Sequence, residues 1–208
     1  MNKINIIIIG GGGHGLSVAE VIMDNPLFNL VGYIDNKRNS VLGKQGLPYI
    51  GDDKAITSDS AAIAAHIGVG HIKSSARREA LFDAAKQAGF ELPLIISKHA
   101  YVSPLAKIDE GTFVMHKAAV NACATIGKNC IINTAAIIEH GVTVGCHCHI
   151  APGATVLGDV RIGKGSFIWA GAIVREGCSI GNEVVIGAGA VIRRDVSDGI
   201  TIKGLDIR

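Results

Sequence analysis

The sequence carries an aliphatic residue at every sixth position from Val102 to Ile192, and all sixteen of these residues are valine or isoleucine. The fourth residue after each of them is small or compact, from Ala106 to Val196. Because side chains two apart on a strand share a face, both positions point inward, and each hexapeptide forms one short strand and a corner. Three hexapeptides make a coil of about 18 residues, and the series predicts a parallel β-helix of about five coils.

Glycines recur after these strands, where we expect corners that need a positive φ or close packing. They are Gly127, Gly145, Gly163, Gly181 and Gly187. Asp198 stands where the next aliphatic residue would fall, and the repeat ends there.

The first hundred residues follow a different pattern. Segments 4–10, 30–35 and 64–70 predict buried strands, segments 14–23 and 75–87 predict helices, and segment 92–96 predicts a fourth short strand. Gly89 suits the end of the second helix. This is a βαβαβ unit with a parallel sheet, half of a Rossmann fold. We expect two domains, an α/β domain over 1–97 and a β-helix over 98–208 that ends in a short tail.

The run NIIIIGGGGHG at 5–15 places Gly10, Gly12 and Gly15 in the G-x-G-x-x-G register of dinucleotide-binding folds. Such glycines allow a tight turn and a close approach to phosphate at a helix N-terminus. A dinucleotide needs two βαβαβ halves, and only one is predicted here. The loop therefore favours a mononucleotide or nucleotide sugar over NAD; the alternative is a tight turn without a ligand, which His14 at the helix start disfavours.

Composition excludes several classes of protein. The 20 basic and 18 acidic residues form no basic block, and 4% aromatic residues offer no stacking platform, so we expect no nucleic acid partner. No apolar stretch reaches membrane-spanning length, and the run MNKINIIII is too short for a signal peptide. Five cysteines without an export signal fit reduced thiols, so we expect a cytoplasmic protein.

The run GCHCHI at 145–150 offers sulfur and nitrogen ligands that suit zinc. Cys148 stands in the inward small position of the repeat, as do Cys130 and Cys178, which makes all three core residues. The histidines of the repeat region also lack the spacing of the three-histidine site in hexapeptide-repeat carbonic anhydrases. We therefore expect no metal.

Motifs in both halves of the chain resemble one family. They are GGGGHG at 10–15, YIDN at 33–36, IGVG at 67–70, NTAAIIEH at 133–140 and HIAPGA at 149–154. The chain resembles the bacterial sugar acetyltransferases of the left-handed β-helix class that act on nucleotide-linked amino sugars, with sialic acid O-acetyltransferases as relatives. The resemblance implies a left-handed coil, a homotrimer, a nucleotide sugar bound by the α/β domain, and acetyl-CoA bound between neighbouring β-helices.

The resemblance also implies roles for individual residues. His140 is the general base, Asn133 orients it, and His149 contacts acetyl-CoA and is the candidate oxyanion donor. Ala170 and Ala188 contact acetyl-CoA through backbone atoms. The substrate positions are Gly12, Gly13, His14, Asp35, Asn36 and Gly70, at the C-terminal ends of predicted strands, where open α/β sheets bind ligands.

Two features depart from the family's pattern. Its base is commonly followed by an acidic residue, but Gly141 follows His140 here, which leaves Glu139 as an alternative carboxylate. The family's Gly-x-Pro-Ala tail is replaced by TIKGLDIR at 201–208, a change that bears on contacts with the adenosine end of CoA.

Three functions are compatible with these observations. The leading one is transfer of acetyl from acetyl-CoA to the amino group of a nucleotide-linked 4-amino sugar, in bacterial surface glycan or glycoprotein sugar synthesis. Neutral imidazole can accept the proton that leaves the attacking nitrogen, and a hydroxyl would demand more of the base. Because Gly141 replaces the acidic residue that would strengthen the base, N-acetylation is favoured over O-acetylation of a sugar such as sialic acid. The third is a non-catalytic nucleotide-binding scaffold.

A homotrimer also has support from the residues themselves. The positions of Phe113, Met115, Phe167 and Trp169 in the repeat predict that they point outward. An exposed apolar row of this kind would be buried against neighbouring copies.

Overall fold

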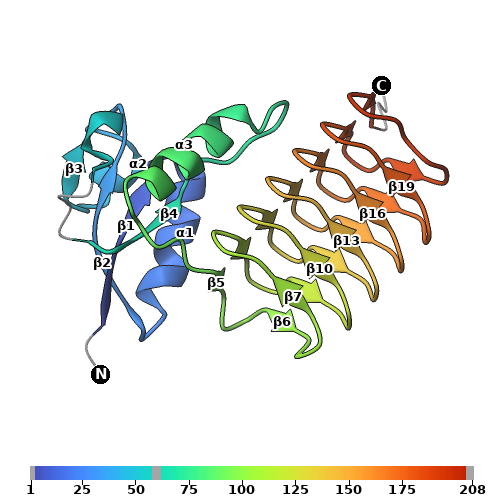
Figure 1. The fold of residues 1–208 in the computed structure, drawn as a ribbon, viewed down its shortest axis with the longest axis horizontal. Helices are drawn as coiled ribbons and strands as arrows, with labels where there is room; N and C mark the ends of the chain where they lie inside the picture. The colour runs from blue at the N-terminus through green and yellow to red at the C-terminus, as the bar shows by residue number, and fades with distance from the viewer. Residues whose placement is uncertain (1–2, 58–61, 205–208) are drawn as a thin grey trace. The chain divides into compact units, whose positions relative to one another are not determined.

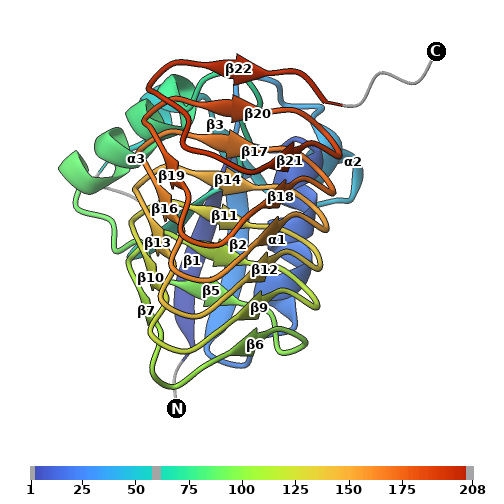
Figure 2. The same ribbon diagram turned by 90° about the vertical axis from the view of Figure 1, so that its right-hand side faces the viewer.

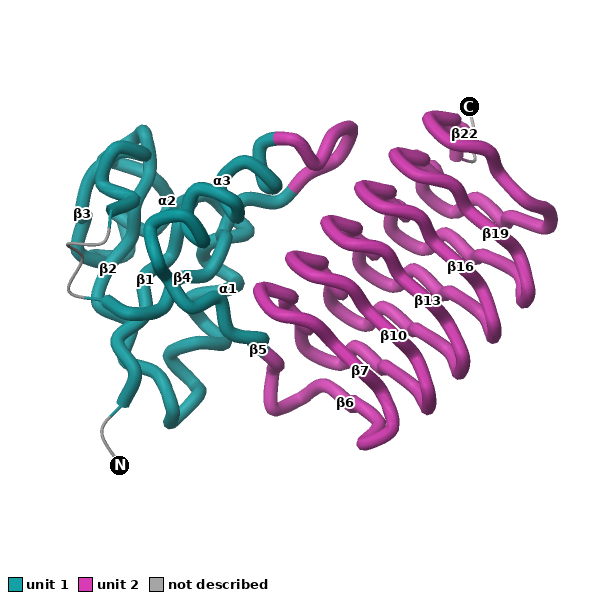
Figure 3. Tube along the Cα trace, in the orientation of Figure 1, with its two compact units in different colours: residues 1–70, 77–95 teal, residues 71–76, 96–208 magenta. Residues whose placement is uncertain are grey.

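The structure, a computed structural model, describes residues 3–57 and 62–204. The chain divides into two compact units, one of residues 1–70 and 77–95 and one of residues 71–76 and 96–208 (Figure 3). The short segment His71–Ala76 therefore belongs with the β-helix, although the helix that follows it in sequence lies almost wholly in the first unit.

The first unit is built on a parallel four-stranded sheet of order β3-β2-β1-β4 (Figure 1). The strands are β1 (Ile4–Ile9), β2 (Phe28–Ile34), β3 (Tyr49–Gly51) and β4 (Ala64–Ile67). The helices are α1 (Gly13–Met23), α2 (Val41–Lys44), the 3-10 turn η1 (Asp53–Ala55) and α3 (Ala76–Gln87). The predicted βαβαβ unit is confirmed. The edge strand β3 was not predicted, because three residues are too few to form a recognisable pattern.

One buried cluster of this unit lies between the sheet and α3. Ile7 and Ile67 of the sheet and Leu81 and Ala85 of the helix share one buried cluster. The predicted strand at 92–96 is shorter than expected: β5 (Ile95–Ile96) forms at its end and heads a sheet of the β-helix.

The second unit is the predicted β-helix, and its two-residue strands form three parallel sheets (Figure 2). The first, of order β19-β16-β13-β10-β7, contains Lys107–Ile108, Thr125–Ile126, Thr143–Val144, Arg161–Ile162 and Ser179–Ile180. The second, of order β21-β18-β15-β12-β9-β6, contains Tyr101–Val102, Ala119–Val120, Ile137–Ile138, Thr155–Val156, Ile173–Val174 and Val191–Ile192. The third, of order β22-β20-β17-β14-β11-β8-β5, adds Phe113–Val114, Ile131–Ile132, His149–Ile150, Phe167–Ile168, Val185–Ile186 and Thr201–Ile202 to β5.

The register confirms the period of the sequence. Ile132 pairs with Ile150, and Ile150 with Ile168, so each aliphatic residue stacks on its equivalent in the next coil. All of these residues from Val114 to Ile192 are buried. Val102 and Ile108, on the first coil, are only half-buried.

The corners use glycine in two ways. A left-handed φ recurs at every sixth residue from Gly111 to Gly189, and several of these positions carry a side chain. The expected glycines are a separate set that serves close packing: a Cβ at Gly127 or Gly145 would lie 2.8 Å or 2.7 Å from a backbone nitrogen of the next coil. These glycines are thus required by the spacing of the coils.

A ladder of hydroxyl and thiol groups runs inside one corner of the coil. Thr112, Cys130, Cys148 and Ser166 each donate a hydrogen bond to the carbonyl of a glycine fifteen residues ahead, at 2.8 to 3.1 Å. The two cysteines therefore do more than fill space, because they satisfy buried carbonyl groups. Burial and the neighbouring Cys130 thiol raise the pKa of Cys148 well above its usual range, which keeps it protonated.

The outward residues differ among the three faces of the coil. The face of β7 to β19 carries polar residues, including Lys107, Thr143 and Arg161. The face of β6 to β21 exposes large apolar residues, namely Tyr101, Ile137, Ile173 and Val191. We call this second surface the apolar face.

Within residues 3–57 and 62–204, no helix has both the length and the apolar character needed to cross a membrane.

Candidate functional site

The glycine loop between β1 and α1 contains two kinds of glycine. A Cβ at Gly10, Gly11 or Gly15 would collide with neighbouring atoms, so these three serve packing within the unit. At Gly12 and Gly13 nothing lies within 4 Å of the place a Cβ would take, and both residues are exposed. Internal packing therefore leaves these two glycines unexplained, and a close-lying ligand would account for them.

The loop meets the first turn of α1 without a side-chain cap. Gly12 is the N-cap residue, and no side-chain cap bond forms there among the described residues. The first N–H groups of the helix and its dipole face the loop, an arrangement suited to phosphate.

Asp35, at the end of β2, fixes the shape of the loop. Its carboxylate accepts hydrogen bonds from Gly11 N at 2.6 Å and from Lys37 N at 2.7 Å. Asn36 donates to Asp53 at 3.2 Å, and Asp53 is also paired with Arg77 at 2.5 Å. Asp35 thus shapes the loop, while Asn36 belongs to an exposed polar group beside it.

Ser40 was not singled out from the sequence. Its Oγ lies against Gly11, where a Cβ would collide with it, and this buried hydroxyl has no hydrogen-bond partner among the described residues. It is the N-cap residue of α2 but forms no side-chain cap. A serine before a short helix is the only sequence signal, and it does not distinguish a cap from a ligand contact.

A buried arginine supports the end of β4. Arg78 has no exposed surface, and its Nη1 donates to Ile67 O at 2.6 Å and to Val69 O at 2.8 Å. These bonds hold the turn that leads to Gly70, and a Cβ at Gly70 would make ordinary contact with His14 at 3.7 Å. The structure therefore brings His14 and Gly70 together at the glycine-loop edge of the sheet.

His140 lies at the corner that follows β12, and its side chain is exposed. Its ring rests on Gly158 of the following coil: a Cβ there would stand 2.7 Å from Cε1 and 2.8 Å from Nε2. Glu139, directly before it, is half-buried.

Asn133 and His149 lie together, but at a different corner from His140. Asn133 Nδ2 is 3.1 Å from His149 Nε2, and His149 Nδ1 is 3.0 Å from the carbonyl oxygen of His71. A carbonyl only accepts, so Nδ1 carries the proton and Nε2 accepts from Asn133. The N–H of His149 is thus directed at His71 and not at solvent.

An aromatic row continues from His149. The Phe167 ring lies 4.9 Å from the His149 ring, and the Trp169 ring lies 4.9 Å from that of Phe167. Trp169 borders a pocket of about 690 Å³ that also includes Ala188, Lys73 and Lys203. This pocket contains one predicted acetyl-CoA contact, Ala188, and Ala170 lies at the same corner one coil earlier, with its carbonyl bonded to Gly189 N.

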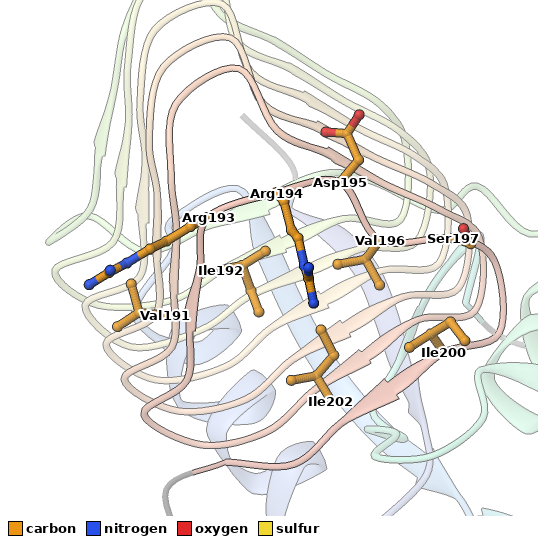
Figure 4. A pocket seen from close by; sticks show the side chains of 9 residues that line it. All are labelled: Val191, Ile192, Arg193, Arg194, Asp195, Val196, Ser197, Ile200 and Ile202. Atoms are coloured by element: carbon orange, nitrogen blue, oxygen red, sulfur yellow. The ribbon is translucent and has the colours of Figure 1, made fainter.

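A second pocket, of about 660 Å³, lies at the last coil of the β-helix (Figure 4). Ile192, Val196 and Ile202 line it, and Arg194 extends between Ile192 and Val196. These isoleucine and valine residues continue the inward series of the repeat, so the pocket is the open end of the apolar core.

The four apolar residues predicted to form an exposed row are not exposed. Phe113, Met115 and Phe167 are buried, and Trp169 is half-buried. They do not form the exposed row from which we argued for a trimer. The exposed apolar residues of the β-helix instead include Tyr101, Ile137, Ile173 and Val191 of the apolar face, which the hexapeptide pattern did not separate from the other faces.

The GCHCHI run does not gather its side chains. Cys148 points into the coil and donates to Gly163 O, while His147 Nδ1 is 2.9 Å from Asn129 Nδ2. Across the described part of the chain, no group of three or more potential metal ligands occurs.

Known protein families match both units. The model of the PglD N-terminal domain matches residues 5–84, that of the hexapeptide repeat of succinyl-transferase matches 124–157, and that of the bacterial transferase hexapeptide matches 159–194. No protein with a curated description matches the sequence.

Solved structures match over almost the whole chain. The acetyltransferase domain of PglB from Neisseria gonorrhoeae, in complex with acetyl coenzyme A, is 35% identical, with 98% of this chain and 97% of that chain covered and a TM-score of 0.89. PerB from Caulobacter crescentus, in complex with CoA and GDP-perosamine, is 32% identical, with 95% and 92% covered and a TM-score of 0.87. WeeI from Acinetobacter baumannii shares the fold at 21% identity and a TM-score of 0.74, with 98% and 97% covered. The chain therefore belongs to the PglB- and PerB-type sugar acetyltransferases of the left-handed β-helix family.

Proposed function

We propose that this protein transfers the acetyl group of acetyl-CoA to the amino group of a nucleotide-linked 4-amino sugar, with His140 as general base. The observation that carries the proposal is the similarity over nearly the full chain to PglB, solved with acetyl coenzyme A, and to PerB, solved with CoA and GDP-perosamine. Two features of this chain support the proposal: a glycine loop at the N-terminus of α1 and a pocket on the β-helix.

The chemistry requires one base and no enzyme nucleophile. The amine nitrogen attacks the thioester carbonyl, the new C–N bond forms, and the C–S bond breaks as CoA leaves. Neutral His140 accepts the proton from nitrogen and can return it to the CoA sulfur. The exposure of His140 lets an acceptor reach it.

The nucleotide sugar binds at the glycine loop. Gly12, Gly13 and the N-terminus of α1 receive the phosphates, because no protein atom lies near the open side of these glycines. Ser40 adds a hydroxyl donor beside Gly11. His14, Gly70 and Asn36 border the same edge of the sheet, and Asp35 keeps the loop in shape.

Acetyl-CoA binds along the corner of Ala170 and Ala188. Small residues there leave room for an extended chain and expose backbone groups, and Lys73 and Lys203 supply cations for phosphate at the adjoining pocket. His149 serves as a fixed wall of this groove, since both of its ring nitrogens are engaged within the chain.

A homotrimer would complete the active site. His140 follows the strand β12, while Thr134, equivalent in the repeat to Ala170 and Ala188, precedes it, so the two corners lie at opposite ends of one face. Six residues of extended chain separate them by about 15–20 Å, too far for one acetyl group to touch both. The face between them is the apolar face, and packing it around a threefold axis would bring the groove of one chain to His140 of the next.

The test is an assay of the purified protein with acetyl-CoA and a panel of acceptors. UDP-, GDP- and dTDP-linked amino sugars are compared with free sialic acid, and CoA release and the acetylated product are both measured. Acetylation of a nucleotide-linked amino sugar at its amine is expected. Transfer only to a sialic acid hydroxyl would replace the proposal with O-acetylation, and no transfer to any acceptor would favour a binding scaffold.

A further inference from the structure

Gly141 and Asp159 face each other across two neighbouring coils. A Cβ at Gly141 would collide with Oδ1 of Asp159, so the aspartate carboxylate already fills the place of a side chain at position 141. The backbones are joined here as well, since Asp159 N donates to His140 O at 3.0 Å. Asp159 has a φ of 59°, the left-handed conformation shared by this corner position along the repeat.

His140 and Gly158 face each other across the same two coils, but here the side chain comes from the first coil and the glycine from the second. The ring of His140 leans onto Gly158, while the carboxylate of Asp159 leans back over Gly141. Each glycine makes room for a side chain from the other coil. Adjacent coils lie about 4.8 Å apart and adjacent residues about 3.8 Å apart, so the ring and the carboxylate occupy neighbouring places in the same gap.

We infer that Asp159 is a positioning residue for His140, whose carboxylate orients the imidazole and stabilises the charge that the ring gains when it accepts a proton. This inference rests on the proposed function of His140. A carboxylate close to imidazole stabilises the protonated form, which is the form created when the base accepts a proton. The sequence separates the two residues by a whole coil, and only the stacking of the coils brings them together.

Three other titratable side chains lie near His140 in the sequence or in the repeat. Glu139 precedes it in the same corner, Cys123 occupies the equivalent of position 141 on the preceding coil, and Arg161 lies two residues beyond Asp159. A carboxylate in the space above Gly141 is provided by Asp159, whereas Glu139 lies on the other side of His140 in sequence. The inference therefore distinguishes Asp159 from Glu139.

The experiment compares Asp159→Asn with two controls of equal charge change. Glu139→Gln tests the alternative carboxylate, and Glu176→Gln removes an exposed acid two coils beyond His140 at the same corner. Asp159→Asn should lower kcat about threefold to tenfold with little change in either KM, because the charged ring formed in the transition state loses a neighbouring carboxylate. Glu176→Gln should stay close to the unmodified protein, and a loss in Glu139→Gln as large as that in Asp159→Asn would overturn the assignment to Asp159. In a His140→Ala background, Asp159→Asn should have no further effect on kcat.

A second readout is independent of turnover. The NMR signals of the His140 ring protons, recorded at one fixed pH, should move in Asp159→Asn, and Gly141→Ala should cause a similar change by displacing the carboxylate. Unchanged signals in Asp159→Asn would overturn the inference even if the acetyl transfer assay succeeds. Moved signals would support it even if every acceptor in the panel fails, so the two proposals can fail separately.

Discussion

The imidazole of His140 rests on the Cα of Gly158, one coil further along the β-helix, at a distance that leaves no room for a methyl group. The three atoms nearest to a Cβ at position 158 all belong to the exposed His140 ring, which can move. Gly158→Ala should therefore preserve the fold while displacing the base. A displacement of about 1 Å can reduce turnover by up to about 100-fold, so we expect a loss of tenfold or more in kcat.

A double variant of His140 and Gly158 provides the control for this change. In a His140→Ala background, Gly158→Ala should cause no additional loss, because the ring it displaces is absent. Equal losses in both backgrounds would mean that Gly158 supports the coil and not the position of His140. Thermal unfolding of each variant would report any damage to the fold.

His140→Ala should reduce kcat by at least about 100-fold, the lower range for removal of a general base, without loss of acetyl-CoA affinity. Asn133→Ala should behave differently, because its amide is bonded to His149 at 3.1 Å, at the corner that leads to the acetyl-CoA groove. We expect it to raise the KM for acetyl-CoA more than it lowers kcat. A fall in kcat matching that of His140→Ala would instead place Asn133 beside the base.

Gly13→Val should leave the protein folded, since nothing lies within 4 Å of the new Cβ. The added side chain would occupy space proposed for the phosphates, so the KM for the nucleotide sugar should rise at least tenfold while the KM for acetyl-CoA stays unchanged. Gly15→Val provides the contrast. Its Cβ would collide with Gly10 O, so this variant should be unstable and not merely a weaker binder. An unaltered sugar KM in a folded Gly13→Val protein would remove the loop from the site.

The apolar face predicts how the oligomer forms. Ile173 is 39% exposed on this face, and a lysine there would bury a charge at the interface proposed for the trimer. Ile173→Lys should sediment as a smaller species and lose most activity, because the groove and His140 would no longer meet. Thr143→Lys, on the polar face, should keep the native mass and activity. A stable monomer of the unmodified protein at micromolar concentration would contradict the trimer directly.

The sequence predicted the β-helix well because one period controls the register, the inward residues and the corners together. Ile132 and Ile150 repeat the same environment, so a pattern of six residues locates both. The contacts that define the site depend on which side chains meet across coils. Asp159 over Gly141 and Asn133 beside His149 are separated by 18 and 16 residues, and nothing in the local sequence marks them. The outward faces were also misjudged, since a strand pattern states that Phe113 points away from the core of the coil but not whether other residues cover it.

A buried histidine makes the stability of the α/β unit depend on pH. Burial, and secondarily the positive charge of Arg78, lowers the pKa of His66 to about 3. The unfolded chain, with an ordinary value near 6.5, therefore binds this proton first as the pH falls. The contribution of neutral His66 is fully present above pH 6.5 and declines between pH 6.5 and about 3, by on the order of 1 kcal/mol per pH unit. Urea unfolding at pH 7.5 and pH 5.0 should show a smaller loss of unfolding free energy for His66→Gln than for the unmodified protein, because glutamine does not titrate. Equal losses in the two proteins would show that the folded and unfolded chains bind this proton equally, which would contradict a lowered pKa for His66.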